Sequence, residues 1–226
     1  MTGFEADAAG DLWRELQANA APIVMLRLPP SASLLDAGTG SAGVGLVLAD
    51  LLAETTISDG DPTRLARLRV LAKDRDLRRV EYRTGSPKQS LLGCGPFDVV
   101  LMLGGWGDAR EEDLLGAVKP SGQVALQLRG SLGKARDTRR RLLNAGFSAA
   151  SIMIPWPILT NSPVAWVEID SAVAWSTLVD RWLPSTGTPG RRAFARAWRG
   201  LAGVQPGVLR SFARYIAPTF CIVATR

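Results

Sequence analysis

The sequence predicts a doubly wound α/β fold with a mostly parallel, seven-stranded sheet and a mostly helical insertion before the last strand. Three observations predict it. Apolar segments alternate with helix-like segments between residues 33 and 154, which is the pattern of βαβ units. A cluster of glycines follows the first of the expected strands. The alternation then breaks at 155–157, and one further apolar segment closes the chain at 219–224.

The expected elements of the first half of the chain rest on spacing and on turn residues. Apolar side chains at helical spacing predict a helix at 5–19, and Pro29-Pro30 prevents its continuation. Strands are expected for the short apolar run 33–36 and for the β-branched run 55–58, with a helix at 44–52 between them. Pro62 is suited to the first position of a helix over 63–73.

In the second half, residues 79–83 form the next expected strand, and the apolar run 97–103 is typical of a buried parallel strand. The turn 119–122 separates a helix from a strand, and Gly146 is a suitable C-cap residue for a basic helix. The remaining helices are expected at 111–118 and 135–144, and the remaining strands at 123–128, 149–154 and 219–224.

This order predicts three parts of the chain. Residues 1–30 form an N-terminal helical segment. Residues 31–154 together with 218–226 form the sheet domain, in which a ligand is expected beyond the carboxyl ends of the strands. Residues 155–217 form an insertion that holds five of the seven tryptophans, and we interpret it as a lid over the substrate; packing in a core is the alternative.

The composition excludes several kinds of chemistry. The chain contains no histidine, so a Ser-His-Asp triad, a Cys-His pair and a histidine-ligated zinc site are excluded. Its two cysteines, Cys94 and Cys221, are too few for a zinc cluster or a disulfide framework, and no metal is expected. No apolar run is long enough to span a bilayer and no signal peptide is evident, so a cytoplasmic location and no membrane partner are expected.

The charge is unevenly distributed along the chain. Residues 155–226 carry eight arginines and three acidic residues, whereas residues 1–154 are close to neutral. Solvated helix faces would explain this excess. A surface that attracts an acidic substrate or a nucleic acid is the alternative.

The strongest motif is the segment 34–43, which reads Leu-Leu-Asp-Ala-Gly-Thr-Gly-Ser-Ala-Gly. Its glycines match the G-x-G-x-x-G dinucleotide fingerprint, which is a weak signal by itself. Asp36 lies two residues before the first of these glycines, where a carboxylate would repel a pyrophosphate. The acidic residue therefore favours a ligand that has an ammonium group and no phosphate, and it disfavours a nicotinamide dehydrogenase.

This segment resembles motif I of the class I S-adenosylmethionine-dependent methyltransferases, in which an acidic residue is followed by x-G-x-G. Ala42 stands where that family pattern has its third glycine. Asp59 ends the second expected strand, and the resemblance implies that it holds both ribose hydroxyls. Asp61 is the other carboxylate nearby, and it is suited to cap the helix that begins at Pro62. The cofactor-binding residues implied in this way are Asp36, Gly38, Thr39, Gly40, Asp59, Gly60, Ser86 and Leu103.

One segment departs from the family pattern. The family often has an acidic residue and a free backbone N–H after its third strand, facing the adenine. The matching segment here is Thr84-Gly85-Ser86-Pro87, in which Ser86 is a weak hydrogen-bonding group and Pro87 has no N–H. Adenine recognition is therefore expected to be partly apolar or shifted.

The segment after the fourth strand supplies the expected catalytic and substrate-binding residues. In the family this end of the sheet faces the transferring methyl group. Asp108 is the first candidate for a general base, and an N-cap role for a helix from Ala109 is its alternative. Trp106, and Trp156 in the insertion, are the candidates for contact with the acceptor.

The function expected from these observations is transfer of a methyl group from S-adenosylmethionine to a small-molecule acceptor at oxygen, in a specialised-metabolite or glycan pathway. An RNA methyltransferase is the alternative suggested by the basic last third. A nonmethylating binding protein on the same fold is the alternative suggested by the departure at Ser86-Pro87.

Overall fold

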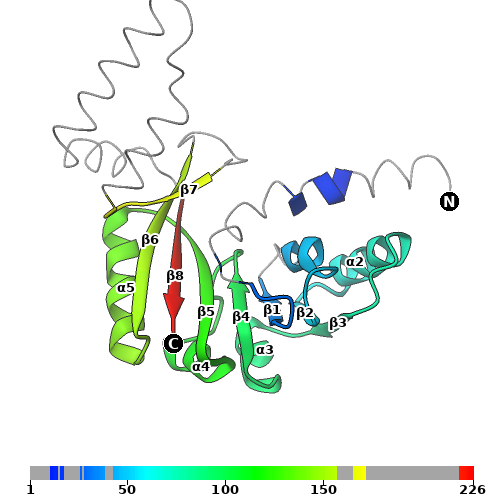
Figure 1. Ribbon diagram of the computed structural model, residues 1–226, viewed down its shortest axis with the longest axis horizontal. Coiled ribbons are helices and arrows are strands. Elements are labelled where there is room, and N and C mark those ends of the chain that lie inside the picture. Colours follow the sequence, from blue (N-terminus) through cyan, green and yellow to red (C-terminus); the bar gives the residue numbers. More distant parts are fainter. Residues whose placement is uncertain are drawn as a thin grey trace, which may run out of the picture.

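Eight strands of the described residues form one sheet, in the spatial order β3-β2-β1-β4-β5-β8-β6-β7 (Figure 1). The structure is a computed structural model that describes residues 11–14, 16–17, 26, 28–38, 43–156, 165–171 and 219–226. The strands are β1 (Ser33–Ala37), β2 (Glu54–Asp59), β3 (Val80–Thr84), β4 (Phe97–Met102), β5 (Val118–Arg129), β6 (Ala149–Trp156), β7 (Ala165–Glu168) and β8 (Thr219–Thr225).

The sheet has the predicted mixed topology. Strands β1 to β5 pair in parallel, while β8 runs antiparallel to both β5 and β6. The α/β fold class is therefore confirmed. Among the described residues the sheet has one strand more than the seven expected, because β7 pairs antiparallel with β6 at the edge. The parallel order brings the carboxyl ends of β1, β2 and β4 to one edge of the sheet.

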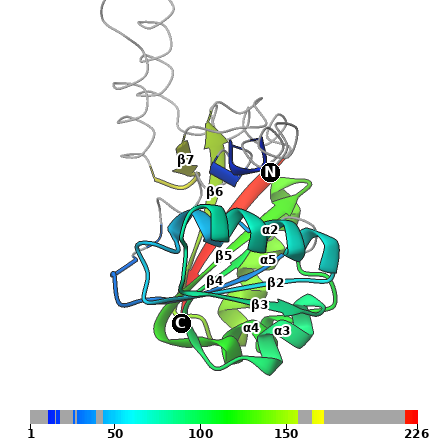
Figure 2. The same ribbon diagram turned by 90° about the vertical axis from the view of Figure 1, so that its right-hand side faces the viewer.

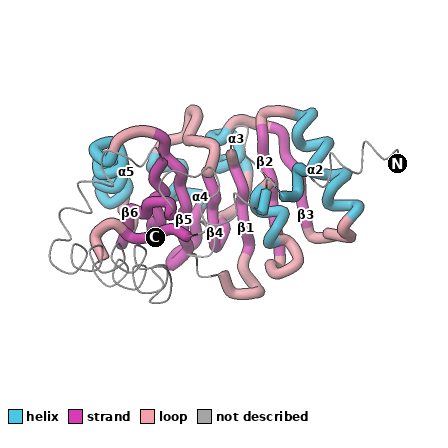
Figure 3. Tube along the Cα trace, turned by 90° about the horizontal axis from the view of Figure 1, so that it is seen from above, coloured by secondary structure: helices cyan, strands magenta, loops and turns pink. Residues whose placement is uncertain are grey.

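Helical elements cover both faces of the sheet, and Figures 2 and 3 show α2 on the opposite side from α3 and α4. Side chains that alternate along each strand supply both layers: Leu35 packs in the cluster that includes α3, α4 and α5, whereas Leu34 packs on the other face with Val44. The described helical elements are η2 (Val44–Leu48), α2 (Pro62–Asp74), α3 (Pro87–Gly93), α4 (Glu111–Ala117) and α5 (Leu132–Ala145).

Several predicted elements differ in their bounds. The expected helix 44–52 is only the short 3₁₀ helix η2, and the predicted turn 119–122 lies within β5 as an irregularity where Ser121 has a φ of 65°. Helix α3 is not among the predicted elements, although Ser86 and Gln89 form a capping box at its start and Pro87 occupies its first turn. Helices α2 and α5 match their predictions, including the Gly146 C-cap at a φ of 114°.

The predicted insertion lies largely outside the described residues. Strand β6 does not stop at the expected break, because Pro155 and Trp156 pair with Trp166 and Ala165 of β7. Residues 157–164 and 172–218 are not described, so the division of the chain into three parts and the lid stay predictions.

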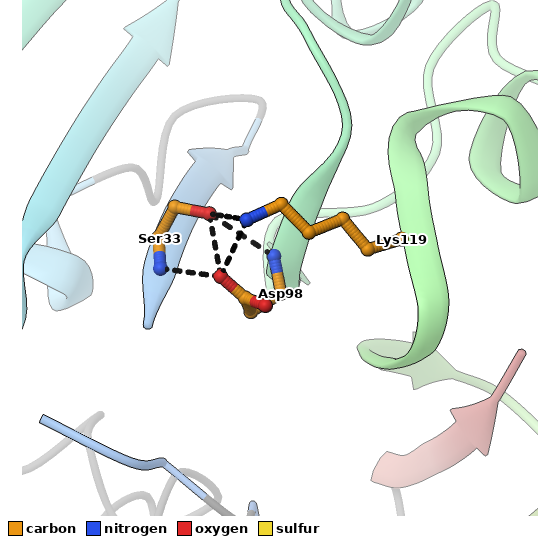
Figure 4. A network of polar contacts seen from close by, with 3 residues as sticks. All are labelled: Ser33, Asp98 and Lys119. Carbon is orange, nitrogen blue, oxygen red and sulfur yellow. Dashed lines mark hydrogen bonds and ion pairs between the residues drawn. The ribbon is translucent and has the colours of Figure 1, made fainter. Parts of the chain in front are cut away.

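Figure 4 shows a polar network of Ser33, Asp98 and Lys119, which joins the amino ends of the neighbouring strands β1, β4 and β5. Asp98 Oδ2 accepts hydrogen bonds from the Ser33 backbone N–H (2.8 Å), the Ser33 hydroxyl (2.8 Å) and the Lys119 ammonium (2.9 Å). Burial of this carboxyl group opposes its ionisation. The bonds from Ser33 and Lys119 together outweigh that effect and lower the pKa of Asp98 to about 2.

Asp98→Asn is expected to reduce the free energy of unfolding by about 1–2 kcal/mol at pH 7, because a charged acceptor is lost; 34% exposure of the side chain keeps the effect small. The contribution depends on a depressed folded-state pKa. It is therefore complete above about pH 4, and it is lost as the pH falls towards 2. Urea unfolding at pH 7 and at pH 3 measures this.

Asp76→Asn is the matched control. Asp76 pairs with Arg78 at the surface, where it is 75% exposed, and asparagine tolerates its φ of 55°. If Asp98→Asn reduces the free energy of unfolding no more than this control does, the network does not stabilise the fold.

Candidate functional site

Two buried carboxylates lie side by side at the carboxyl edge of the sheet. Residues Asp36 of β1 and Ile57 of β2 are register partners, and Ala37 is opposite Ser58, so Asp59 follows one residue beyond the paired positions. Asp36 is 0% exposed and Asp59 is 2% exposed. The sequence-predicted pair is therefore brought together by adjacent parallel strands.

Asp36 is held by the backbone of the segment that follows the glycine cluster. Its Oδ2 atom accepts hydrogen bonds of 2.8 Å from the N–H groups of Gly43 and Gly45. Its Oδ1 atom is buried and has no hydrogen-bond partner in the described part of the chain. One carboxylate oxygen therefore binds the backbone of this segment, and the other is an acceptor that no described residue uses.

The two glycines are needed for this approach of backbone to carboxylate. Gly43 has a φ of 118°, in the left-handed region. A Cβ atom at Gly45 would lie 2.7 Å from Leu34 Cδ2 and 3.2 Å from Asp36 Cβ. The sequence motif includes Gly43, but Gly45 was not among the expected site residues, since it lies outside the fingerprint.

Burial raises the pKa of Asp36. Desolvation raises the pKa of this carboxyl group from 3.8 to about 6, although the hydrogen bonds from Gly45 and Gly43 oppose the shift. The positive charge of Arg64 also lowers the pKa of Asp36, and the negative charge of Asp59 raises it. A cation bound beside Oδ1 would favour the ionised form.

Asp59 is the last residue of β2. Its Oδ1 atom accepts the Asp61 N–H at 2.8 Å, and its Oδ2 atom lies 3.8 Å from Arg64 Nε in an ion pair. Asp61 has the helix-capping role considered for it, because its side chain accepts the Thr63 N–H at 2.8 Å. Arg64 had no sequence signal of its own, since it is one of several arginines of α2.

The remaining expected cofactor residues are only partly described. Gly38 is buried just after β1. Gly60 is exposed, and a Cβ there would meet only the Gly85 carbonyl oxygen, at 3.8 Å. Leu103 is buried after β4. Thr39 and Gly40 lie outside the described residues, so their contacts with Asp36 or a ligand stay predictions.

Ser86 and Asp108 meet although they are far apart in the sequence. Asp108 Oδ2 accepts the Ser86 hydroxyl at 2.8 Å, and its Oδ1 atom accepts the Lys88 N–H at 3.1 Å. These two bonds, first that from Ser86 and then that from Lys88, lower the pKa of Asp108. Asp108 does not cap a helix that begins at Ala109, which was the alternative role considered for it. Helix α4 begins at Glu111, and Asp108 binds the N-terminus of α3 instead.

The two expected aromatic contacts with the acceptor stay predictions. Trp106 is partly buried against the core cluster of α3, α4 and α5, and the guanidinium carbon of Arg141 lies 5.9 Å from the centre of its ring. The indole N–H of Trp106 is buried without a hydrogen-bond partner among the described residues. Trp156 ends β6, and its side chain is not among those described.

Searches for metal sites and membrane spans give no candidates in the described residues. No group of three or more His, Cys, Asp or Glu side chains is arranged to hold a metal ion there. No described helix has the length and apolar character that crossing a bilayer requires.

Comparison with solved structures identifies the fold. The phosphoethanolamine N-methyltransferase 2 of Haemonchus contortus, in complex with S-adenosylmethionine, matches 93% of this chain with 52% of its own length, at 14% identity and a TM-score of 0.54. The precorrin-6Y C5,15-methyltransferase of Geobacter metallireducens matches 92% of this chain and 87% of its own, at 14% identity and a TM-score of 0.51.

The chain has the class I S-adenosylmethionine-dependent methyltransferase fold. No protein-family model and no curated protein sequence matches it. The [4+2]-cyclase SpnF has the same fold, and it matches 94% of this chain and 80% of its own at 14% identity and a TM-score of 0.51. The methyltransferase fold therefore does not by itself decide the reaction.

Proposed function

We propose that this protein is an S-adenosylmethionine-dependent methyltransferase that acts on a small-molecule acceptor at oxygen. The observation that carries the proposal is the pair of buried carboxylates, Asp36 and Asp59, at the ends of adjacent strands. The methyltransferase fold supports it, because in open α/β sheets ligands bind beyond this edge.

The donor set fits S-adenosylmethionine. The buried Oδ1 atom of Asp36 lacks a partner among the described residues and can accept an ammonium N–H. The two oxygens of Asp59 are suited to accept the two hydroxyls of a ribose, and burial makes such bonds stronger than they are in water. Asp36 disfavours a dinucleotide, because its carboxylate beside the glycine segment would repel a pyrophosphate.

Bound S-adenosylmethionine would supply an activated methyl group and a good leaving group. The residues of this chain would then contribute mainly by orienting the cofactor and the acceptor, since positioning alone lowers such a barrier considerably. Thr39, Gly40, Gly60, Ser86 and Leu103 would complete the cofactor crevice. Trp106 and Trp156 would contact the acceptor, under a lid formed by the insertion 155–217. The setting would be cytoplasmic, where Cys94 and Cys221 stay reduced.

Binding and transfer are tested separately. Titration calorimetry should detect one bound S-adenosylmethionine per chain. If no heat of binding is measured, the cofactor assignment is contradicted. S-adenosylmethionine with an isotopically labelled methyl group, incubated with a small-molecule extract, should label a metabolite. Labelling of RNA in a parallel incubation, with none in the extract, would contradict the acceptor class.

A second candidate is a protein that binds S-adenosylmethionine without transferring its methyl group. The similarity in fold to the SpnF cyclase favours it, as does Pro87, which removes a backbone N–H at the expected adenine side. Calorimetric binding without transfer of label to any acceptor is the result that this candidate predicts.

A further inference from the structure

The loop between β4 and α4, residues 103–110, is rich in glycine and contains a turn in which the Ala109 N–H donates to the Trp106 carbonyl oxygen at 3.0 Å. It contains Gly104, Gly105 and Gly107, and the φ angles of Gly105 (110°) and Gly107 (56°) are left-handed. Because β4 pairs with β1, this loop leaves the sheet at the edge where Asp36 lies. Any function that needs one loop conformation therefore depends on contacts with other segments.

Asp108 provides such contacts by completing the N-terminal cap of α3. The first helical residue, Pro87, has no N–H, and the Gln89 N–H is accepted by Ser86 Oγ at 3.3 Å. The Lys88 N–H between them is accepted by Asp108 Oδ1 at 3.1 Å, and the Ser86 hydroxyl donates to Asp108 Oδ2 at 2.8 Å. A residue from another loop therefore finishes this helix end.

The same turn is bonded to β2. The Gly85 N–H donates to the Asp59 carbonyl oxygen at 3.2 Å. The Ser90 hydroxyl contacts the Ser86 carbonyl oxygen at 2.9 Å and also forms a buried hydrogen bond with the Ser58 hydroxyl. Hydrogen bonds thus connect the end of β2 through the β3–α3 turn to Asp108 in the β4–α4 loop.

We propose that Asp108 is a positioning residue that clasps the β4–α4 loop to the N-terminus of α3 and so holds two walls of the cofactor crevice together. The role rests on the proposed function, because the crevice is the S-adenosylmethionine site only if that function holds. It differs from the general-base role that the sequence suggested. Both carboxylate oxygens already accept hydrogen bonds, and these bonds lower the pKa of Asp108, which makes it a weaker base.

The test compares Asp108→Ala, Asp108→Asn and Ser86→Ala with the wild-type chain. Loss of the clasp in Asp108→Ala should accelerate hydrogen exchange at the Lys88 amide and weaken S-adenosylmethionine binding about tenfold, the effect of about two hydrogen bonds. Asparagine has a carbonyl oxygen for the Lys88 N–H and an amide group for Ser86, so Asp108→Asn should restore both readouts. Ser86→Ala removes the contact with Asp108 and also the cap at the Gln89 N–H, so it too should accelerate hydrogen exchange at the Lys88 amide.

Asp113→Ala is the matched control, since Asp113 accepts the Arg110 N–H at 2.9 Å within the same region but bonds to no second loop through that contact. In Asp113→Ala, the rate of hydrogen exchange at the Lys88 amide and the affinity for S-adenosylmethionine should equal those of the wild-type chain. Unchanged exchange at Lys88 in Asp108→Ala would overturn the clasp. Faster exchange with unchanged affinity would overturn its positioning role.

Kinetics distinguish the clasp from a base. A positioning role predicts that Asp108→Ala raises KM for S-adenosylmethionine, with the pH profile of kcat retained. An Asp108→Asn variant as inactive as Asp108→Ala, with a changed pH profile, would overturn the proposal in favour of proton transfer. A wild-type chain that binds no S-adenosylmethionine would refute the proposed function and this role toward the cofactor, while the exchange at Lys88 would still report on the clasp itself.

Discussion

Asp59→Asn is expected to weaken S-adenosylmethionine binding roughly 10- to 150-fold, because about 1.5–3 kcal/mol is lost with a hydrogen bond to a charged group. An asparagine oxygen can still accept the Asp61 N–H, as Asp59 Oδ1 does. Its amide group would replace Oδ2, the atom that pairs with Arg64, and it could not accept a second hydroxyl. Titration calorimetry of the purified variant measures the loss.

Asp61→Ala separates this effect from damage to the neighbouring helix. Asp61 caps α2 through the Thr63 N–H, so its removal should cost about 1 kcal/mol of stability and leave the cofactor affinity unchanged. If Asp61→Ala weakened binding as much as Asp59→Asn, the ribose assignment would move from Asp59 to Asp61. If neither variant changed the affinity, the end of β2 would not belong to the cofactor site.

Asp36→Asn is expected to bind S-adenosylmethionine at least tenfold more weakly and yet to be more resistant to unfolding at pH 8. The pKa of Asp36 is raised from 3.8 to about 6, mainly by desolvation, so keeping it ionised costs the folded chain about 3 kcal/mol above pH 6. Asparagine carries no charge, and its oxygen can accept the N–H groups of Gly43 and Gly45. The variant should therefore bind the cationic cofactor more weakly and have a larger free energy of unfolding.

The sign of the pH dependence follows from a raised folded-state pKa. The wild-type free energy of unfolding should fall as the pH rises from about 4 to about 6, and Asp36→Asn should lack this component. The affinity for S-adenosylmethionine should rise over the same interval, because its cationic groups prefer the ionised carboxylate. Urea unfolding and calorimetry across pH 4 to 8 measure both. Equal affinities of the two proteins at pH 8 would exclude Asp36 from recognition of the cofactor's charge.

The sheet and its carboxylates could be predicted because their signals are local. The alternation of apolar and helix-like segments specified β1 to β5, and Asp36 and Asp59 each end a strand that is recognisable from its own residues. Adjacent parallel strands then necessarily bring these two side chains to one edge. Bounds were less predictable where a short turn competes with a helix, as in η2. Helix α3 does have a local start signal, the capping box of Ser86 and Gln89 with Pro87 between them, but with only seven residues it has little periodicity to indicate a helix.

Contacts between distant loops had no comparable signal. Nothing in the segment around Asp108 indicates that its carboxylate binds Ser86 and Lys88, more than 19 residues away. Likewise, the packing of Trp106 beside Arg141 depends on how the β4–α4 loop lies against α5. The amino acid sequence alone determined the sheet and the two acidic strand ends, because periodicity and turn chemistry act over a few residues. Only the tertiary structure decided which loops are bonded to each other and how Asp36 is buried, because these depend on segments that meet only after the chain has folded.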